Sequence, residues 1–317
     1  MRAVAPISAV IATRNRAESV VRTLDSLLEQ DLLPSQLIIV DASDDNVTRH
    51  HIDKFRQRVA GESSAIWLSA DVAGAAPQRN QGVAHATQPF IWFFDDDIIF
   101  QTNCAQRLWR AIELDRQLGG VNAMIVNQRY QPPGFLSWAV FTLMHGQREK
   151  SFAGKVIGPA INLLPEDHED LPDVVPVEWL NTTCTLYRRE ALPSPPFDSF
   201  FSGYSMMEDL ALSVRVARDW KLANVRSARI RHESQLGTHK EDARAVAKME
   251  MINRLYVMVN LLSRSQPMDY LRLGLWETFA TVSTLAEPSG IRDLPNVLAG
   301  KFDALRSFRS LPRVKSN

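Results

Sequence analysis

The first hundred residues alternate short apolar runs with amphipathic segments. Four runs have the length and apolar content of buried parallel strands: residues 7–12, 37–40, 65–68 and 90–94. Between the first two runs, apolar residues recur at helical spacing (Val20, Leu24, Leu27 and Leu28), after Asn15 and Glu18, which resemble a capping pair. Residues 77–86 predict a second helix with proline in its first turn. This alternation predicts an α/β fold with a mostly parallel sheet and helices on both faces.

The pattern changes after residue 115. Residues 121–126 and 179–188 predict two further strands, and residues 208–220 predict a helix. The segment 130–176 is rich in proline, glycine and irregular polar stretches, which favours loops that form part of a substrate pocket. After residue 232 the chain becomes helical, with a stripe formed by Ile252, Leu255, Val259 and Leu262.

This pattern divides the chain into two parts. Residues 1–235 are expected to form one domain, with a first half of about residues 1–130 and a second half of about residues 131–235. Residues 236–317 are expected to form a C-terminal helical extension. A chain of 317 residues is long enough for this arrangement and for a sizeable core.

Charge and cysteine content exclude several classes of protein. The 36 basic residues balance 36 acidic ones, so no overall positive field favours nucleic acid as a partner. The two cysteines cannot build a disulfide scaffold and form no metal-binding pair. The apolar run at residues 7–12 is too short for a signal peptide, and the uncharged stretch 130–147 is too short and too proline-rich to span a bilayer. We therefore expect a cytoplasmic protein.

The C-terminal part leaves a peripheral membrane contact open. From Ile291 onward the chain has six basic and two acidic residues, with Leu298, Phe302 and Leu305 at helical spacing. This pattern fits a helix packed on the rest of the protein. It equally fits a basic amphipathic helix on the inner face of a membrane.

Two acidic groups follow predicted strands directly. Asp41 ends the run 37–40, and Asp95, Asp96 and Asp97 end the run 90–94. The carboxyl ends of parallel strands are where open sheets bind ligands. Three aspartates after a buried strand suit a hard divalent cation, and Mg²⁺ in proteins often accompanies a diphosphate. The alternative is a solvated turn.

Several segments in order resemble the motifs of family 2 glycosyltransferases. The matching segments are ISAVIATRNR (residues 7–16), IIVDAS (38–43), QRNQG (78–82), FFDDD (93–97), TLYRREAL (185–192), MEDLALSVR (207–215) and His232 after a short strand. The resemblance covers most of residues 7–235 and implies the GT-A fold, a Rossmann-like fold of nucleotide-diphospho-sugar transferases. Two departures stand in the first motif, where Ala12 and Arg14 replace the family's frequent proline and tyrosine.

The resemblance also implies roles for individual residues. It assigns the donor nucleotide to Thr13, Arg14, Asn15, Asp41, Arg79, Asp95 and Asp96. It assigns a divalent cation, Mg²⁺ or Mn²⁺, to Asp97 and His232, and it assigns the acceptor side to Tyr204 and Glu208. An imidazole ligand would favour tolerance of Mn²⁺. For His232, a surface position beside Arg229 and Arg231 is the alternative.

The activity implied is a metal-dependent inverting transfer of a sugar from a UDP- or dTDP-sugar to a hydroxyl of a saccharide or lipid-linked acceptor, in polysaccharide or cell-envelope glycan synthesis. Asp209 is the candidate catalytic base, because inverting transfer needs a carboxylate that removes the proton of the acceptor hydroxyl. An acidic residue that stabilises a helix N-terminus is the alternative for Asp209. A non-catalytic nucleotide-sugar binding module stays open. So does a Mg²⁺-dependent phosphohydrolase using Asp95 and Asp97, although the sequence lacks that class's later motifs.

Overall fold

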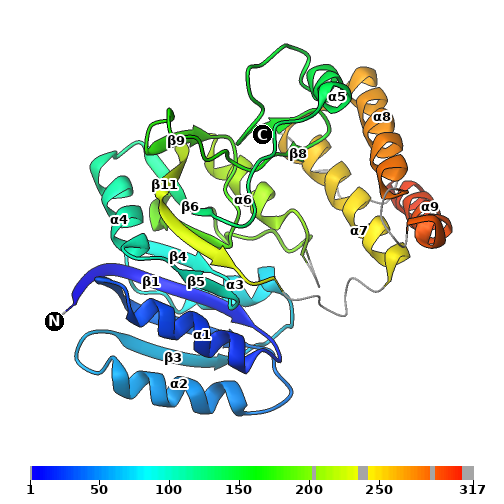
Figure 1. Cartoon of the computed structure of the whole chain (residues 1–317). Helices are drawn as coiled ribbons and strands as arrows, with labels where there is room; N and C mark the ends of the chain where they lie inside the picture. The colour runs from blue at the N-terminus through cyan, green and yellow to red at the C-terminus, as the bar shows by residue number, and fades with distance from the viewer. Residues whose placement is uncertain (1, 202–204, 235–241, 286–289, 309–317) are drawn as a thin grey trace. The chain divides into compact units, whose positions relative to one another are not determined.

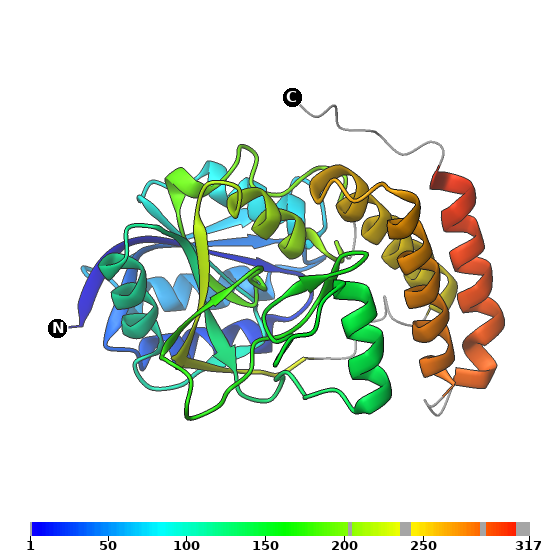
Figure 2. The same cartoon turned by 90° about the horizontal axis from the view of Figure 1, so that it is seen from above.

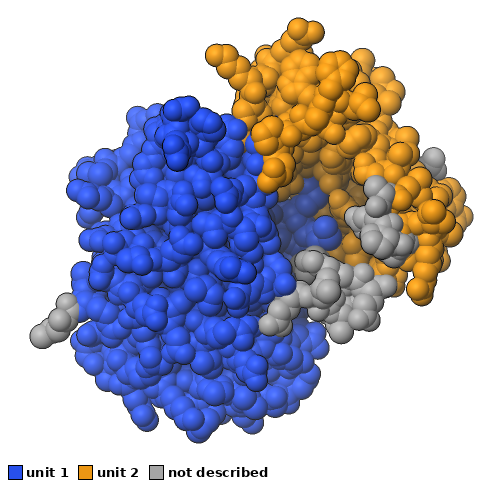
Figure 3. Space-filling view, viewed as in Figure 1, with its two compact units in different colours: residues 1–130, 164–235 blue, residues 131–163, 236–317 orange. Residues whose placement is uncertain are grey.

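The computed structural model describes residues 2–201, 205–234, 242–285 and 290–308 (Figure 1). The chain divides into two compact units, residues 1–130 with 164–235 and residues 131–163 with 236–317 (Figure 3). Unit 1 ends at residue 235, and residues 131–163 group with the C-terminal helices in unit 2. The expected division into a domain of residues 1–235 and a helical extension stays a prediction.

Unit 1 is an α/β unit around a nine-stranded sheet. Its strands are β1 (Ala3–Thr13), β2 (Leu32–Asp41), β3 (Ser64–Ser69), β4 (Phe90–Phe94), β5 (Ile98–Phe100), β6 (Leu118–Ile125), β9 (Val174–Val177), β10 (Cys184–Arg188) and β11 (Lys221–His232). Its helices are α1 (Ala17–Leu28), α2 (Val47–Arg58), α3 (Ala75–Ala84), α4 (Cys104–Leu114), the short 3₁₀ turn Arg189–Ala191 and α6 (Glu208–Val216). The predicted α/β class with a mostly parallel sheet is confirmed.

The strand order is β3-β2-β1-β4-β10-β6-β11-β5, with β9 paired to β11 as well. Strands β1 to β4 are parallel, as are β6 and β11, whereas β10 runs antiparallel to both of its neighbours. Strand β5 is antiparallel to β11. The two views in Figures 1 and 2 show this sheet with helices on both faces.

The core of unit 1 follows the alternation of side chains along the strands. Ala9 and Ile11 of β1 face a cluster that includes apolar residues of α1, α2 and α4. The opposite face packs against α3, and a Cβ on Gly82 of α3 would lie only 2.4 Å from Val10 Cγ1. Glycine therefore allows α3 to approach the sheet closely, which fixes the position of the Arg79 side chain on the same helix.

Helix α1 begins differently from the sequence expectation. Asn15 has φ of +54° and its side chain bonds Asp44 of the next strand-to-helix turn, while Arg16 is the N-cap residue and makes no side-chain cap. The predicted Asn15–Glu18 capping pair is thus wrong. The Asn15 amide instead ties together two turns at the carboxyl edge of the sheet.

Unit 2 is a small helical unit. It consists of α5 (Phe135–His145), the hairpin β7 (Val156–Ile157) and β8 (Ile161–Asn162), α7 (Ala243–Tyr256), the π-helical turn η3 (Val257–Leu261), α8 (Pro267–Thr284) and α9 (Gly290–Phe308). Its core joins α7, α8 and α9 through Met251, Leu255, Met258, Leu273 and Ala304. Within the described residues, no helix combines the length and the apolar content that crossing a bilayer requires.

Candidate active site

The acidic groups of unit 1 meet at one edge of the sheet. Thr13 at the end of β1 lies in register with Asp41 at the end of β2. Strand β4 runs parallel to β1 on its other side, so Asp95, Asp96 and Asp97 follow at the same edge. The expected placement of both acidic groups on one edge is confirmed.

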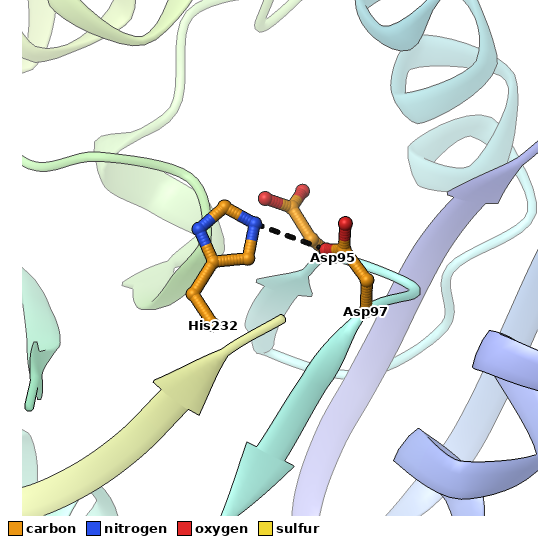
Figure 4. A group of neighbouring side chains, drawn as sticks. All are labelled: Asp95, Asp97 and His232. Atoms are coloured by element: carbon orange, nitrogen blue, oxygen red, sulfur yellow. Dashed lines mark ion pairs between the residues drawn. The ribbon is translucent and has the colours of Figure 1, made fainter. Parts of the chain in front are cut away.

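Asp95, Asp97 and His232 form a group that can hold a metal ion (Figure 4). One ligand atom from each residue lies within 4.8 Å of the others. His232 is distant from the two aspartates in the sequence. The antiparallel pairing of β11 with β5 brings it close to them, because it places His232 opposite Ile98. The backbone of His232 is held from both sides, since it donates to Asn127 Oδ1 and accepts from Asn127 Nδ2.

Charge at this group is balanced by neighbouring cations. His232 Nε2 lies 3.0 Å from Asp97 Oδ1, and Arg16 Nη1 donates to Asp97 Oδ2 at 3.0 Å. Burial lowers the pKa of His232, but the hydrogen bond to Asp97 and the charges of Asp95 and Asp97 outweigh burial, so the net shift is upward. The Asp97 side chain is only 5% exposed, so its negative charge requires such partners. Two carboxylates and one imidazole fit a divalent cation, and the imidazole suits Mn²⁺.

Asp96, the middle aspartate, has different contacts from its two neighbours. Its Oδ2 accepts a 2.6 Å hydrogen bond from the Thr13 hydroxyl, and its Oδ1 accepts from Arg16. Burial raises the pKa of Asp96 to about 6. Thr13 is itself buried. The contacts of Thr13 and Asp96 with each other join β1 to the loop after β4, and their expected roles toward a nucleotide remain predictions.

Asp41 has a preorganised carboxylate. Its Oδ2 accepts from the indole N–H of Trp67 at 3.1 Å, and its Oδ1 accepts from the Ser43 backbone at 2.9 Å. Trp67 also lies under the Arg49 guanidinium, 5.0 Å from the ring centroid. Arg14, a predicted nucleotide contact, is exposed at this end of the sheet.

Arg79 connects the two sides of the site. Its Nη2 donates to Asp95 Oδ1 at 2.7 Å and its Nη1 donates to Glu208 Oε1 at 2.9 Å. The side chain is 6% exposed and packs against the ring of Phe197. Burial lowers the pKa of Arg79, and the charges of Asp95 and Glu208 outweigh burial and raise it. The expected donor-side residue thus pairs with an expected acceptor-side residue.

The two acids at the start of α6 differ in their partners. Burial and the charge of Asp209 raise the pKa of Glu208, against the opposing effect of Arg79. Asp209 makes no ion pair within the described part of the chain, and its Oδ1 accepts from the Leu210 backbone at 2.7 Å. Burial raises the pKa of Asp209 to about 6. A carboxylate with such a pKa is suited to general-base work near neutral pH. Tyr204, the other expected acceptor-side residue, lies outside the described residues.

Three residues of the site had no role assigned from the sequence. Arg16 lies inside the first motif, one residue before helix α1. This position in the motif was the signal in the sequence that could have indicated a role at the site. Trp67 sits on the third predicted strand among apolar residues. Asn127 gave no signal, because its contact with His232 depends on the pairing of distant strands.

The comparisons with known proteins agree with this geometry. Residues 8–155 match the model of the family described as glycosyl transferase family 2, which confirms the resemblance read from the motifs over that segment. No curated protein matches the chain.

Solved structures show the same fold. A mannosyltransferase, PcManGT from Pyrobaculum calidifontis in complex with GDP-Man and Mn²⁺, is similar with a TM-score of 0.53 and 14% identity, over 96% of this chain and 87% of that chain. GalNAc-T7 with UDP, GalNAc and Mn²⁺ is similar with a TM-score of 0.54 and 15% identity, over 73% of this chain and 44% of that chain. The fold is therefore that of GT-A glycosyltransferases.

Proposed function

From the family 2 match over residues 8–155, we propose that this protein is a metal-dependent inverting glycosyltransferase that uses a nucleoside diphosphate sugar as donor. The observation that carries the proposal is the Asp95–Asp97–His232 group, which lies at the same sheet edge as Asp41 and is linked by Arg79 to Glu208 at the start of α6. Both similar structures are complexes with Mn²⁺, one with GDP-Man and one with UDP. The acceptor is proposed to be a hydroxyl of a saccharide or of a lipid-linked sugar.

The proposed donor side has groups that can bind both parts of a nucleoside diphosphate. Asp41, fixed by Trp67 and Ser43, offers a carboxylate with a set orientation for hydroxyl or N–H groups of the nucleoside. A divalent cation held by Asp95, Asp97 and His232 would neutralise the negative charge of the diphosphate. Arg16 contacts Asp97 of this group and the adjacent Asp96, and it supplies a positive charge from the chain itself.

The acceptor side provides the base. In the transfer, the acceptor oxygen forms a bond to the anomeric carbon, the bond from that carbon to the diphosphate oxygen breaks, and the diphosphate leaves with the electron pair. Asp209 takes the proton of the acceptor hydroxyl. Glu208 is less suited to this task because the ion pair with Arg79 already engages its carboxylate.

Two measurements on the same protein test the proposal. Thermal unfolding is followed with UDP-, dTDP- and GDP-sugars, each with Mn²⁺, with Mg²⁺ and with a chelator, because a ligand that binds the folded state raises the melting temperature. Release of nucleoside diphosphate is then measured with saccharide and lipid-linked acceptors. We expect metal-dependent stabilisation by at least one donor and acceptor-dependent release. Stabilisation with no release from any acceptor would favour the non-catalytic module, and release of inorganic phosphate would favour the phosphohydrolase.

A further inference from the structure

Unit 2 exposes most of the large apolar side chains that lie on the surface of the described residues. Unit 1 contributes only five of them: Val4, Val47, Val72, Leu114 and Val174. The others stand on α5, on α8 with its C-cap, and on α9 (Figures 1 and 2). A concentration of exposed apolar residues on one part of a protein marks an interaction surface.

Helix α9 carries one continuous exposed stripe. Exposed apolar residues follow at intervals of four, three, four and three: Ile291, Pro295, Leu298, Phe302 and Leu305. The opposite side of α9 packs on α7. On that side, Ala304 of α9 is fully buried, and a Cβ on Gly300 of α9 would lie 2.2 Å from the carbonyl oxygen of Arg244 in α7. The stripe therefore points away from α7.

Helix α8 repeats this arrangement. Five exposed apolar residues have the same helical spacing: Met268, Leu271, Leu275, Val282 and, at the C-cap, Leu285. Tyr270, which is 38% exposed, lies outside this stripe. Leu273, on the other side, packs with Met251 and Leu255 of α7. The ion pair between Glu277 and Lys301 holds α8 beside α9. Both outer helices thus cover α7 with one side and expose apolar residues on the other.

Helix α5 adds a third exposed segment. Phe135 and Leu136 are 83% and 77% exposed, and Leu143 continues their stripe two turns later. Phe141, on another side of the helix, packs against Phe152 and Trp276 of the same unit. The helix contains no Asp, Glu, Lys or Arg.

The exposed charges on α8 and α9 have one sign. On α8 and α9, the exposed charged residues are Arg292 and Arg306. The acidic residues of both helices are partly buried, and three of them are engaged: Asp269 caps α8, Glu277 pairs with Lys301 and Asp303 pairs with Arg244. Arg306 also lies over the ring of Phe302 within the stripe. By sequence, residues 286–289 between the two helices add one acidic residue, and residues 309–317 add three basic ones.

We propose that the outer side of α5, α8 and α9 binds the surface of an anionic lipid bilayer. Apolar stripes flanked by arginine are typical of helices that lie in the headgroup region, with the guanidinium groups at lipid phosphates. None of the described helices can cross a bilayer, so the contact is parallel to the membrane plane. A second copy of this chain offers no exposed acidic residue among the described residues of α8 and α9 to pair with Arg292 and Arg306, whereas an anionic bilayer offers phosphate groups, which disfavours the symmetric contact. The proposal does not depend on the proposed function, because the lipid contact needs no sugar donor.

Cosedimentation of the full chain with vesicles tests the proposal. We expect binding to phosphatidylcholine vesicles that contain phosphatidylglycerol, and much weaker binding to phosphatidylcholine alone. The double variant Leu298→Glu with Phe302→Glu should lose at least about tenfold in affinity, since each residue buries an apolar side chain in the lipid. The pair Arg292→Gln with Arg306→Gln should lose the preference for the anionic lipid and its sensitivity to salt.

Matched variants on unit 1 provide the control. Val72→Glu with Leu114→Glu introduces the same charge at residues that are at least as exposed, and this variant should bind vesicles like the wild type. A cooperative thermal unfolding transition in each variant shows that it is folded. Three outcomes would overturn the proposal: no vesicle binding by the wild type, undiminished binding by the Leu298 and Phe302 variant, or a dimer without lipid that this variant dissociates. The variant Asp209→Asn should keep full vesicle binding, which separates this test from the proposed function.

Discussion

The Arg79 guanidinium donates a 2.9 Å hydrogen bond to Glu208, while its other terminal nitrogen donates to Asp95. These three residues come from α3, from the loop after β4 and from the start of α6. One buried cation therefore joins Asp95 of the metal group to Glu208, the residue beside the candidate base Asp209. This link gives Arg79 a positioning role that can be measured.

Replacement of Arg79 tests this link. Arg79→Gln leaves Glu208 and Asp95 without their cation, and removal of one partner from a buried ion pair costs about 3 to 5 kcal/mol of stability. The double variant Arg79→Gln with Glu208→Gln should recover part of this loss, because it also removes the Glu208 carboxylate that the single variant leaves buried without a cation. Urea unfolding of the wild type, both single variants and the double variant measures the coupling. Additive losses would show that the pair is not coupled.

Replacement of Asp97 tests the metal group. Asp97→Ala removes the carboxylate that contacts both His232 and Arg16, so binding of a nucleoside diphosphate should lose most of its dependence on Mn²⁺. Calorimetric titration with UDP or GDP, with metal and with chelator, measures the effect. Asp25→Asn, at a half-exposed surface ion pair with Arg58, is the control and should behave like the wild type. If the metal dependence is unchanged in Asp97→Ala, the metal binds at other residues.

Replacement of Asp209 tests the base. Asp209→Asn should leave donor and metal binding nearly intact while transfer falls on the order of 10²–10⁴-fold, the usual contribution of a general base. Because burial raises the pKa of Asp209 above its unfolded value, the ionised form costs stability at neutral pH, and the amide should raise the melting temperature there. A role in stabilising the helix N-terminus predicts the reverse, a loss of up to about 1 kcal/mol with normal turnover. If turnover of Asp209→Asn is near normal, Glu208 is the next residue to test.

The pH dependence of transfer should follow the same carboxyl group. Asp209 acts as a base only when it is deprotonated, so kcat should rise with pH through about 6 and level off above pH 7. The effect of Asp209 on stability has the opposite direction. Its pKa is higher in the folded protein than in the unfolded chain, so the free energy of unfolding falls as pH rises from the pKa of the unfolded chain to about 6. Rates and melting temperatures of the wild type and Asp209→Asn over pH 4.5 to about 8 separate the two effects. If the residual activity of Asp209→Asn still rises with pH through about 6, another group is responsible for that pH dependence.

The sequence by itself determined most of the local elements and the motifs that resemble the family matched over residues 8–155. The apolar runs around Val10, Ile39 and Phe93 are strands because such runs are buried on both faces of a parallel sheet. A parallel sheet places the residue after each strand at one edge, so Asp41 and Asp95 could be located together from their sequence positions alone. The helix expected at residues 208–220 is also present, although it ends at Val216.

Only the tertiary structure decided which of these residues meet. The pairing of β11 with β5 brings His232 to Asp97, and no local pattern specifies a contact across more than a hundred residues. The same holds for Arg79, whose guanidinium lies between Asp95 and Glu208. Its expected contact with a nucleotide stays a prediction. Residues 131–163 join the C-terminal helices for a similar reason, because an irregular segment has no periodicity that reveals its packing partner. Periodicity determines which face of an element is buried, whereas long-range packing determines the partner against which it is buried.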